Sequence, residues 1–491
     1  MRILHVCSEF YPLLKTGGLA DVLGALPLAL KKKGVDSRIL IPGFPSVLNA
    51  IKEKSALHEV KQIDTFAGNI TIFYAVFQKL PFYIIDAPHL YAREGSPYHD
   101  EYQNDYRDNA IRFALLSFIG AELANNLDPY WSASIVHAHD WHSGLTPAYL
   151  AQNGYPAKSV FTIHNLAFSG CFPYISDDEL SGYQHISLLD KIGLDNRMFS
   201  IDGLEFHGKV SFLKAGLYYS SHVTTVSPTY AQEITLPDFG CGFDGLLASK
   251  KQSGKLTGIL NGVDYSLWSP KKDPNLKHSY DARQLNNKSL NKLDLQENYH
   301  LTKDSTIPLF SVVSRLSHQK GLDLLIDVIP FLIEKNAQLF ILGSGDKVLE
   351  EKFLSLAKEY PNHIAVKIGY DEELAHNLTA ASDIMLIPSR FEPCGLTQLY
   401  AMKYGTLPLV RNTGGLADTV VDITQTNITE KLATGIVFNQ ANTTELIVAL
   451  EKTFSLWQNK TAWKQVQKNA MKRDFSWSLI ADAYIAIYQS L

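Results

Sequence analysis

The chain has 491 residues, more than a single domain usually holds, so we expect two domains. Hydrophobic residues make up 46% and charged residues 19%, as in globular proteins with an ordinary core. The formal net charge of −5 excludes a general electrostatic attraction to nucleic acid or to an anionic membrane. Its four cysteines lack metal-ligand spacing, which disfavours structural zinc and fits a reducing cytoplasm.

The first half of the chain alternates short apolar strands with helices. The opening MRILHVCSEF is typical of a buried strand rather than a signal peptide, and no apolar run is long enough to span a bilayer. A helix is expected over roughly 19–33, with Leu19, Leu23, Leu26 and Leu30 as its buried stripe. We expect strands at 3–9, 38–42, 71–77, 82–86, 134–140, 158–164 and 222–227, with 71–77 and 82–86 forming a hairpin.

The second half restarts this alternation. An amphipathic helix ends the chain, and we interpret 271–305 as loops and one exposed helix packed on the second domain. The polar segment ASKKQSGKLTG (248–258) is the candidate linker. Strands followed by helices are expected at 309–316, 338–346, 364–370, 383–389 and 407–415. The pattern predicts an α/β fold with two doubly wound, Rossmann-like domains, at 1–250 and 251–475, followed by a terminal helix at 476–491.

One Gly-Gly turn occurs twice, as TGGLADVL (16–23) and TGGLADTV (413–420). Between a strand and a helix, such a turn lets a ligand approach the backbone, and the free N–H groups of the helix suit phosphate. Lys15 would add a positive charge beside the first turn. The alternative is that both segments are tight turns and that Lys15 is solvated. A third turn, LGSGD (342–346), matches only the first two glycines of the dinucleotide fingerprint, so a nicotinamide site is poorly supported.

Polar residues gather where other strands end. HAHDWHSGL (137–145) suggests a metal site, but strand alternation sends His137 and His139 to one face and Asp140 to the other. We therefore expect packed, hydrogen-bonded histidines, no metal, and an Asp140 carboxylate that faces a ligand. In FTIHNL, His164 ends another strand, where a structural or a catalytic role is open.

Two further loops carry charged residues. In SRLSHQKG, Arg315 and Lys320 could converge on one anion such as a diphosphate, or be two surface cations. In SRFEPCGLTQLYAM, Glu392 offers an acceptor beside the N–H groups of a helix start, which suits a polyhydroxylated ligand bearing phosphate. Cys394 lacks a convincing base partner, so we interpret it as packing or as part of the site lining.

Seven motifs, in the same order and over essentially the whole chain, resemble those of the bacterial glycogen synthase family, which is related to plant starch synthases. They are KTGGLADV (15–22), HAHDWHSGL (137–145), TIHNL (162–166), GILNGVD (258–264), SRLSHQKGLD (314–323), SRFEPCGL (389–396) and RNTGGLADTV (411–420). The resemblance implies the GT-B fold, in which two doubly wound domains face a deep cleft and the terminal helix crosses back to the first domain. It implies transfer of glucose from ADP-glucose to the non-reducing 4-OH of an α-1,4-glucan with retention, without a metal ion or cofactor.

The resemblance also implies roles for individual residues. His164 would touch the transferred glucose near its 6-hydroxyl, Asp140 would orient sugar hydroxyls or the acceptor, and Glu392 would bind the glucose 3- and 4-hydroxyls. Arg315 and Lys320 would hold the diphosphate. The remaining donor-binding residues that it implies are Lys15, Gly18, Asp21, Asn261, Cys394, Gly395, Leu396 and Thr397.

Three other functions compete with this interpretation. The first is a UDP-glucose-dependent glycosyltransferase: the seven motifs favour ADP, but the choice of base depends on loop contacts that the sequence does not reveal. The second is a non-catalytic glucan-binding protein, which would not release nucleotide. An NAD-dependent oxidoreductase would need a full G-x-G-x-x-G, which is missing. Many retaining GT-B enzymes carry a second Glu at the position of Tyr400. The sequence therefore does not predict a carboxylate that binds the ribose. The sequence leaves open whether the chain forms a homo-oligomer.

Overall fold

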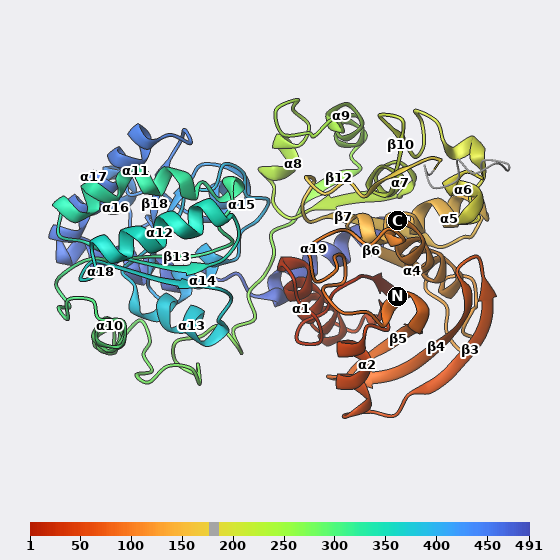
Figure 1. The fold of residues 1–491 in the computed structure, drawn as a ribbon, viewed down its shortest axis with the longest axis horizontal. Coiled ribbons are helices and arrows are strands. Elements are labelled where there is room, and N and C mark those ends of the chain that lie inside the picture. Colours follow the sequence, from red (N-terminus) through yellow and green to blue (C-terminus); the bar gives the residue numbers. More distant parts are fainter. Residues whose placement is uncertain (176–185) are drawn as a thin grey trace. The chain divides into compact units, whose positions relative to one another are not determined.

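The computed structural model describes residues 1–175 and 186–491, which form two compact units (Figure 1). Unit 1 consists of Met1–Val226, Ala231–Gly262 and Trp477–Leu491, and unit 2 of Ser227–Tyr230 and Val263–Ser476. Each unit is built around its own sheet and its own apolar core. Among the described residues, no helix combines the length and the apolar character needed to cross a membrane.

The described part of unit 1 contains a nine-stranded sheet in the order β12-β11-β7-β6-β1-β2-β5-β4-β3. Its strands are β1 (Arg2–Val6), β2 (Asp36–Pro42), β3 (His58–Thr65), β4 (Gly68–Phe77), β5 (Leu80–Asp86), β6 (Ile135–His139), β7 (Lys158–Ile163), β11 (His222–Thr225) and β12 (Leu256–Gly258). All neighbours pair in parallel except β3–β4 and β4–β5, so the predicted hairpin is confirmed. The sequence analysis missed β3, whose side chains are mostly exposed and carry no apolar alternation.

Helices cover this sheet, and the predicted first helix is confirmed as α1. Its four stripe leucines are buried, and α19 packs beside it with Tyr484 and Tyr488 in the same core. The helices are α1 (Gly18–Lys32), α2 (Pro45–Lys52), α3 (Pro88–Tyr91), α4 (Asn109–Leu123), α5 (Thr146–Gln152), α6 (Leu188–Lys191), α7 (Phe212–Tyr219), α8 (Tyr230–Glu233), α9 (Asp244–Gln252) and α19 (Trp477–Ser490). A small sheet joins β8 (Cys171–Pro173), β10 (Lys209–Ser211) and β9 (Glu205–Phe206).

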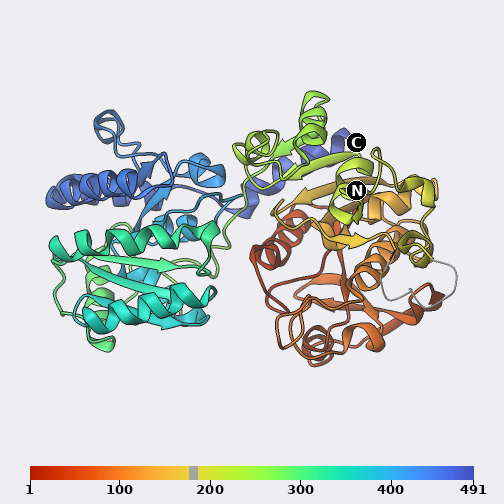
Figure 2. The same ribbon diagram turned by 45° about the horizontal axis from the view of Figure 1, so that its top comes forward.

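Unit 2, which is described throughout, has a six-stranded, wholly parallel sheet in the order β15-β14-β13-β16-β17-β18 (Figure 2). The strands are β13 (Leu309–Val313), β14 (Gln338–Gly343), β15 (Ile364–Ile368), β16 (Ile384–Ile387), β17 (Leu407–Arg411) and β18 (Ile436–Phe438). The helices are α10 (Asn286–Asn298), α11 (Leu322–Glu334), α12 (Lys347–Glu359), α13 (Glu372–Ala381), α14 (Thr397–Lys403), α15 (Gly414–Thr419), α16 (Gln425–Thr429), α17 (Thr443–Gln458) and α18 (Lys460–Lys472). The five predicted strands are therefore confirmed, each followed by a helix.

The linker prediction was wrong. Residues 248–258 belong to α9 and β12, and β12 pairs in parallel with β11 inside the first sheet. Apart from the short stretch Ser227–Tyr230, the chain passes into unit 2 between Gly262 and Val263, later than the expected boundary after Lys250. The polar composition that suggested a linker comes from α9, a surface helix in which only Leu247 is buried.

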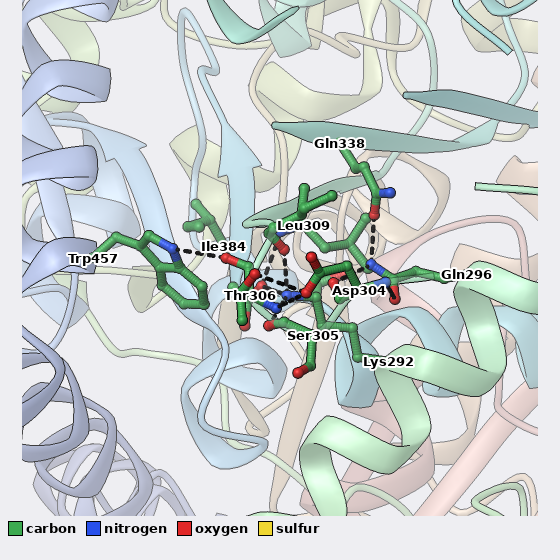
Figure 3. A network of polar contacts seen from close by, with 12 residues as sticks. Lys292, Gln296, Asp304, Ser305, Thr306, Leu309, Gln338, Ile384 and Trp457 are labelled. Carbon is green, nitrogen blue, oxygen red and sulfur yellow. Dashed lines mark hydrogen bonds and ion pairs between the residues drawn. The ribbon is translucent and has the colours of Figure 1, made fainter. Parts of the chain in front are cut away.

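The segment 271–305 folds onto unit 2 through a buried polar network rather than through an exposed helix. From α10, the Lys292 ammonium donates to the carbonyls of Ser305 (3.0 Å) and Ile307 (2.5 Å) and pairs with the Asp383 carboxylate (2.6 Å) (Figure 3). The same carboxylate accepts from the Leu309 amide at 2.9 Å. Because these polar groups satisfy one another, a helix of low hydrophobicity can cover the start of β13.

Removing the Lys292 charge should destabilise unit 2. We expect Lys292→Met to lower its free energy of unfolding by about 3 kcal/mol or more, because the buried Asp383 carboxylate then lacks its cation. Chemical denaturation followed by fluorescence would measure the change. The control is Lys303→Met, which breaks the exposed Lys303–Glu297 pair (2.6 Å) of the same segment and should leave the transition in place. Equal effects of the two variants would contradict this account.

Candidate active site

The order of the strands fixes where unit 2 can bind a ligand. β13 has β14 on one side and β16 on the other, so the connections after β13 and β16 leave in opposite directions. In doubly wound sheets, ligands bind at such a switch point, outside the carboxyl ends of the strands. A pocket opens there, and Lys320, Glu392, Gly395, Leu396 and Thr397 are among its lining residues. These five predicted site residues are thus brought together.

A partly buried ion pair organises this pocket. The Lys320 ammonium lies 2.5 Å from one Glu392 oxygen, and the Ser389 hydroxyl donates to the same oxygen at 2.9 Å. Glu392 is 6% exposed, so water does not compete strongly for its charge. Cys394, 4% exposed, is also packed into this segment. The sequence analysis had considered Lys320 as a partner of Arg315 on a common anion, whereas in the structure its direct partner is Glu392.

Arg315 lies in the loop after β13, on the surface of unit 2 and outside the set of residues that line the pocket. The loop is held by the LGSGD turn: the Leu316 amide donates to Ser344 O (2.9 Å), and the Asp346 amide donates to Leu316 O (2.7 Å). A Cβ on Gly343 would lie 1.8 Å from Ser314 O. The glycines of this turn therefore allow two loops to touch, which explains them without a dinucleotide.

The two copies of the Gly-Gly turn serve different purposes. Gly414 has φ of +46°, and a Cβ there would lie 1.9 Å from Glu392 O; one on Gly415 would lie 2.1 Å from Cys394 O. The second copy thus packs against the backbone of the Glu392 segment. At Gly17, in contrast, a Cβ would meet no described atom within 4 Å. Open space remains beside the first copy, as the phosphate-loop interpretation requires.

In unit 1 the corresponding edge is formed by the adjacent strands β1, β6 and β7. Asp140 follows β6, His164 follows β7, and Asp140 Oδ1 accepts a hydrogen bond from the His164 amide at 2.8 Å. Asp140 has φ of +56° and ψ of −178°, a conformation that residues with a side chain rarely adopt. The bond to His164 helps to hold this strained backbone in place. Burial raises the pKa of the Asp140 carboxyl to about 7, an effect that the nearby Glu9 carboxylate increases.

The other predicted residues of unit 1 lie near the ends of β1 and β12. Gly18 is the first residue of α1, and the Lys15 ammonium pairs with Asp21 at 2.8 Å, with both side chains partly exposed. Lys15 also lies 5.4 Å from the centre of the Tyr11 ring. Asn261 is 6% exposed and follows β12. Lys15 and Asp21 thus form one polar group at the start of α1.

The sequence analysis missed Glu9 because it assigned residues 3–9 to a strand, whereas β1 ends at Val6. The Glu9 carboxylate accepts from the amides of Thr16 (2.6 Å) and Gly17 (3.2 Å), from the Thr16 hydroxyl (2.5 Å) and from the Tyr98 hydroxyl (2.5 Å). Glu9 therefore shapes the first glycine turn by binding the amides of Thr16 and Gly17, while the N–H groups of the helix itself begin at Gly18. An acidic residue just after an apolar strand was the available signal.

Three buried histidines, His5, His137 and His139, offer possible metal-ligand atoms within 4.8 Å of one another. His137, however, is hydrogen-bonded at both ring nitrogens, to the Tyr488 hydroxyl (2.7 Å) and the Thr162 hydroxyl (2.6 Å). The rings of His137 and His139 stack with centres 4.0 Å apart, which confirms that both lie on one face of β6. Both ring nitrogens of His137 and of His139 are engaged in protein hydrogen bonds, as expected for packed histidines.

Comparison with known proteins identifies the family. The model of the starch synthase catalytic domain matches residues 2–249, and that of glycosyl transferases group 1 matches residues 297–472. The chain is 55% identical to a glycogen synthase of Pasteurella multocida over 491 residues, all of this chain and 99% of the relative. The chain belongs to the glycogen synthase family. A glycogen synthase of Mannheimia succiniciproducens is 54% identical over the full length of both chains.

Solved structures agree with this family and with its GT-B fold. The catalytic domain of starch synthase IV from Arabidopsis thaliana, bound to ADP and acarbose, superposes with a TM-score of 0.86 at 31% identity, covering 100% of this chain and 99% of that one. Sucrose-phosphate synthase from Thermosynechococcus elongatus superposes with a TM-score of 0.56 at 15% identity over 100% and 99% of the two chains, which shows the shared fold alone. The glycogen synthase family thus accounts for both Rossmann-like units.

The different roles of the two glycine turns can be tested by stability. We expect Gly414→Ala to lower the melting temperature of unit 2 by about 5 °C or more, because the methyl group would overlap the rigid backbone at Glu392. Gly17→Ala and Gly245→Ala, both at positions where a Cβ meets no described atom within 4 Å, should not lower the melting temperature, and Gly245→Ala should raise it slightly because alanine favours the helix α9. Differential scanning calorimetry provides the measurement. A parent-like melting temperature for Gly414→Ala would contradict the packing role.

Proposed function

We propose that this protein is a glycogen synthase that transfers glucose from ADP-glucose to the non-reducing 4-OH of an α-1,4-glucan, with retention, and releases ADP. The observation that carries the proposal is the pocket at the unit 2 switch point, where Lys320, Glu392 and the start of α14 lie together. The polar residues of its mixed lining, which include Lys320, Glu392 and Thr397, suit a sugar that bears phosphate. ADP in the related starch synthase IV structure supports an adenine nucleotide as the donor.

The donor would be held by charge and by hydroxyl recognition. Lys320 and Arg315 bind the diphosphate, whose negative charge compensates the Lys320 ammonium from the side opposite Glu392. The Glu392 carboxylate accepts from the glucose 3- and 4-hydroxyls, beside the amides of Cys394 and Gly395. Leu396 and Thr397 complete the donor pocket. The Lys320–Glu392 pair supports this arrangement because it fixes both groups before the donor arrives, which lowers the cost of binding.

Unit 1 would supply contacts to the donor phosphates and to the sugars. Lys15, Asp21 and Gly18 act at the start of α1, where the open space beside Gly17 admits a phosphate. His164 contacts the transferred glucose, and its carbonyl supports positive charge at the anomeric carbon. Asp140 orients sugar hydroxyls, and Asn261 lines the acceptor side of the donor sugar.

Retention would follow from attack on the face that the nucleotide leaves. The bond between the anomeric carbon and the phosphate oxygen breaks through an oxocarbenium-like state, and the acceptor O4 forms the new bond to the same carbon. The O4 proton passes to the departing phosphate oxygen. Glu392, which accepts from Lys320 and Ser389, and Asp140, which accepts from the His164 amide, are used in this proposal to bind hydroxyls and not as nucleophiles, so no covalent intermediate forms.

We further propose that no metal ion takes part, because Lys15, Arg315 and Lys320 can neutralise the leaving diphosphate. Activity that persists in excess EDTA would support this view. A cytoplasmic location fits the described cysteines, all of which are free thiols. The partners are then ADP-glucose and a glycogen primer, and neither nucleic acid nor membrane is involved.

The donor assignment can be tested by measuring nucleotide release with glycogen as primer. We expect release from ADP-glucose to exceed release from UDP-glucose, and Lys320→Gln to lower kcat/KM by about 100-fold or more, because the diphosphate loses a preorganised cation. The control is Lys347→Gln, which breaks another Lys–Glu pair of unit 2 (2.7 Å) outside the pocket and should retain full activity. Faster transfer from UDP-glucose would favour the UDP-dependent alternative, and an absence of nucleotide release would favour a glucan-binding protein.

Activity should also depend on the ionisation of Asp140. Its pKa is raised to about 7, so the carboxyl takes up a proton as the pH falls through neutrality and loses acceptor strength toward sugar hydroxyls. We expect kcat/KM to decline below about pH 7 in the parent enzyme. Asp140→Asn should have lower activity that no longer changes with pH over this range. An unchanged acid limb in that variant would assign the titration to another group.

A further inference from the structure

A row of buried imidazoles leads from the core of unit 1 to His164. His164 Nε2 lies 3.1 Å from His139 Nδ1, and His139 Nε2 lies 3.2 Å from His5 Nδ1. His5 comes from β1 and His139 from β6, adjacent strands that pair in parallel with His5 opposite His137. The proposed function uses only His164 among these three rings, so the role of the other two is open.

All three imidazoles are neutral at physiological pH. Burial lowers the pKa of His5 and of His164 to about 3, and it lowers the pKa of His139 well below its usual range, with the neighbouring histidines adding to the effect. A neutral imidazole has one N–H donor and one bare acceptor nitrogen. Each hydrogen bond in the row therefore needs one protonated and one bare nitrogen, and all three rings must point the same way.

Two directions satisfy the two hydrogen bonds, but they differ at the buried end. His5 Nε2 is buried and has no hydrogen-bond partner among the described residues. If every ring carried its proton on Nε2, His5 would bury an unpaired N–H group. If every ring carries it on Nδ1, His5 leaves only a bare lone pair. Among buried backbone groups, orphaned N–H donors are rarer than under-satisfied acceptors, and we apply the same preference to the imidazole.

We propose that His5 and His139 are positioning residues that fix His164 as the tautomer protonated on Nδ1, so that this nitrogen donates a hydrogen bond to the transferred sugar. The role of the sugar contact rests on the proposed function, whereas the tautomer itself does not. His5 Nδ1 donates to His139 Nε2, and His139 Nδ1 donates to His164 Nε2. His164 Nδ1, which has no hydrogen-bond partner in the described part of the chain, is left as a donor.

His137 does not dictate the direction of the row. Its two partners, the hydroxyls of Tyr488 and Thr162, can each donate or accept, and Thr162 is also bonded to the Thr224 hydroxyl at 2.6 Å. His137 can thus adopt either tautomer without disturbing its neighbours. A metal ion bound by His5, His137 and His139 would have to take a nitrogen that now holds either His5 or His164, and so would break the row.

The tautomer can be read directly in the free protein. In protein labelled with ¹⁵N at histidine, a long-range ¹H–¹⁵N spectrum separates protonated from bare ring nitrogens, and the His164 signals are assigned by their loss in His164→Gln. We expect Nδ1 protonated and Nε2 bare over about pH 6 to 8, since no ring titrates there. A proton on Nε2, or an even mixture, would overturn the proposal, as would a stoichiometric metal ion found by elemental analysis of the purified protein.

Variants separate positioning from simple packing. His139→Phe keeps a buried ring but removes the donor to His164, so we expect mixed tautomers at His164 and a roughly tenfold or greater loss of kcat, with little change in the KM for ADP-glucose. His139→Asn can restore a donor near the Nδ1 position and should recover part of both. His142→Phe is the matched control, because His142 is also a buried ring close in sequence to Asp140 but takes no part in the hydrogen bonds of the row; it should leave the His164 tautomer unchanged.

The outcomes distinguish this inference from the proposed function. If His139→Phe kept a single Nδ1 tautomer at His164 together with full kcat, the positioning role would be wrong. If the parent protein showed the expected tautomer but His164→Gln were fully active, the row would stand and the sugar contact assigned to His164 would fail. The measurement on the parent protein needs only His164→Gln, for assignment, so poor folding of His139→Phe would not leave the tautomer undecided.

Discussion

Both sets of predicted site residues depend on one geometric constraint, which is that neighbouring parallel strands deliver their last residues to the same edge of a sheet. In unit 1 this constraint brings Asp140 and His164 within one hydrogen bond, although they are far apart in sequence. In unit 2 it brings Lys320 and Glu392 into contact from the loops after β13 and β16. The helices and the cores of the two units can be understood as the support that keeps these edges in register.

Charges gathered at such an edge are costly unless each finds a partner. The Glu9 carboxylate accepts four hydrogen bonds, and the Lys320 ammonium pairs with Glu392. The Asp140 carboxylate accepts from a backbone amide, and its pKa is about 7. These arrangements fix the groups in place before any ligand arrives. A site built in this way needs little rearrangement to bind a charged donor, which is the condition for strong electrostatic stabilisation of a leaving diphosphate.

The strands and helices were predicted well from the sequence where apolar residues repeat. The prediction was wrong where a helix or a strand is mostly polar. Residues 248–258 look like a linker because α9 exposes most of its surface, and β3 carries no apolar alternation because it lies at an exposed edge. The repeated Gly-Gly motif could not reveal that Gly414 accommodates the Glu392 carbonyl while Gly17 faces open space. That difference depends on contacts between residues that are distant in sequence. The hydrogen bonds from the first turn to Glu9 could not be predicted for the same reason.

The titration behaviour of the site groups limits which chemistry unit 1 can supply. His164 and His139 have pKa values far below neutrality, so neither can act as an imidazolium acid, and a ring with such weak basicity is a poor proton acceptor. Asp140 is the one group of this trio that titrates near neutral pH, but its carboxylate is already engaged with the His164 amide. This fits the proposed transfer of the acceptor proton to the departing phosphate rather than to one of the two histidines. The proposed mechanism uses hydrogen-bond donors and cations that are fixed in place. For the histidines of unit 1, the ring nitrogen that carries the proton is then more important than the basicity of the ring.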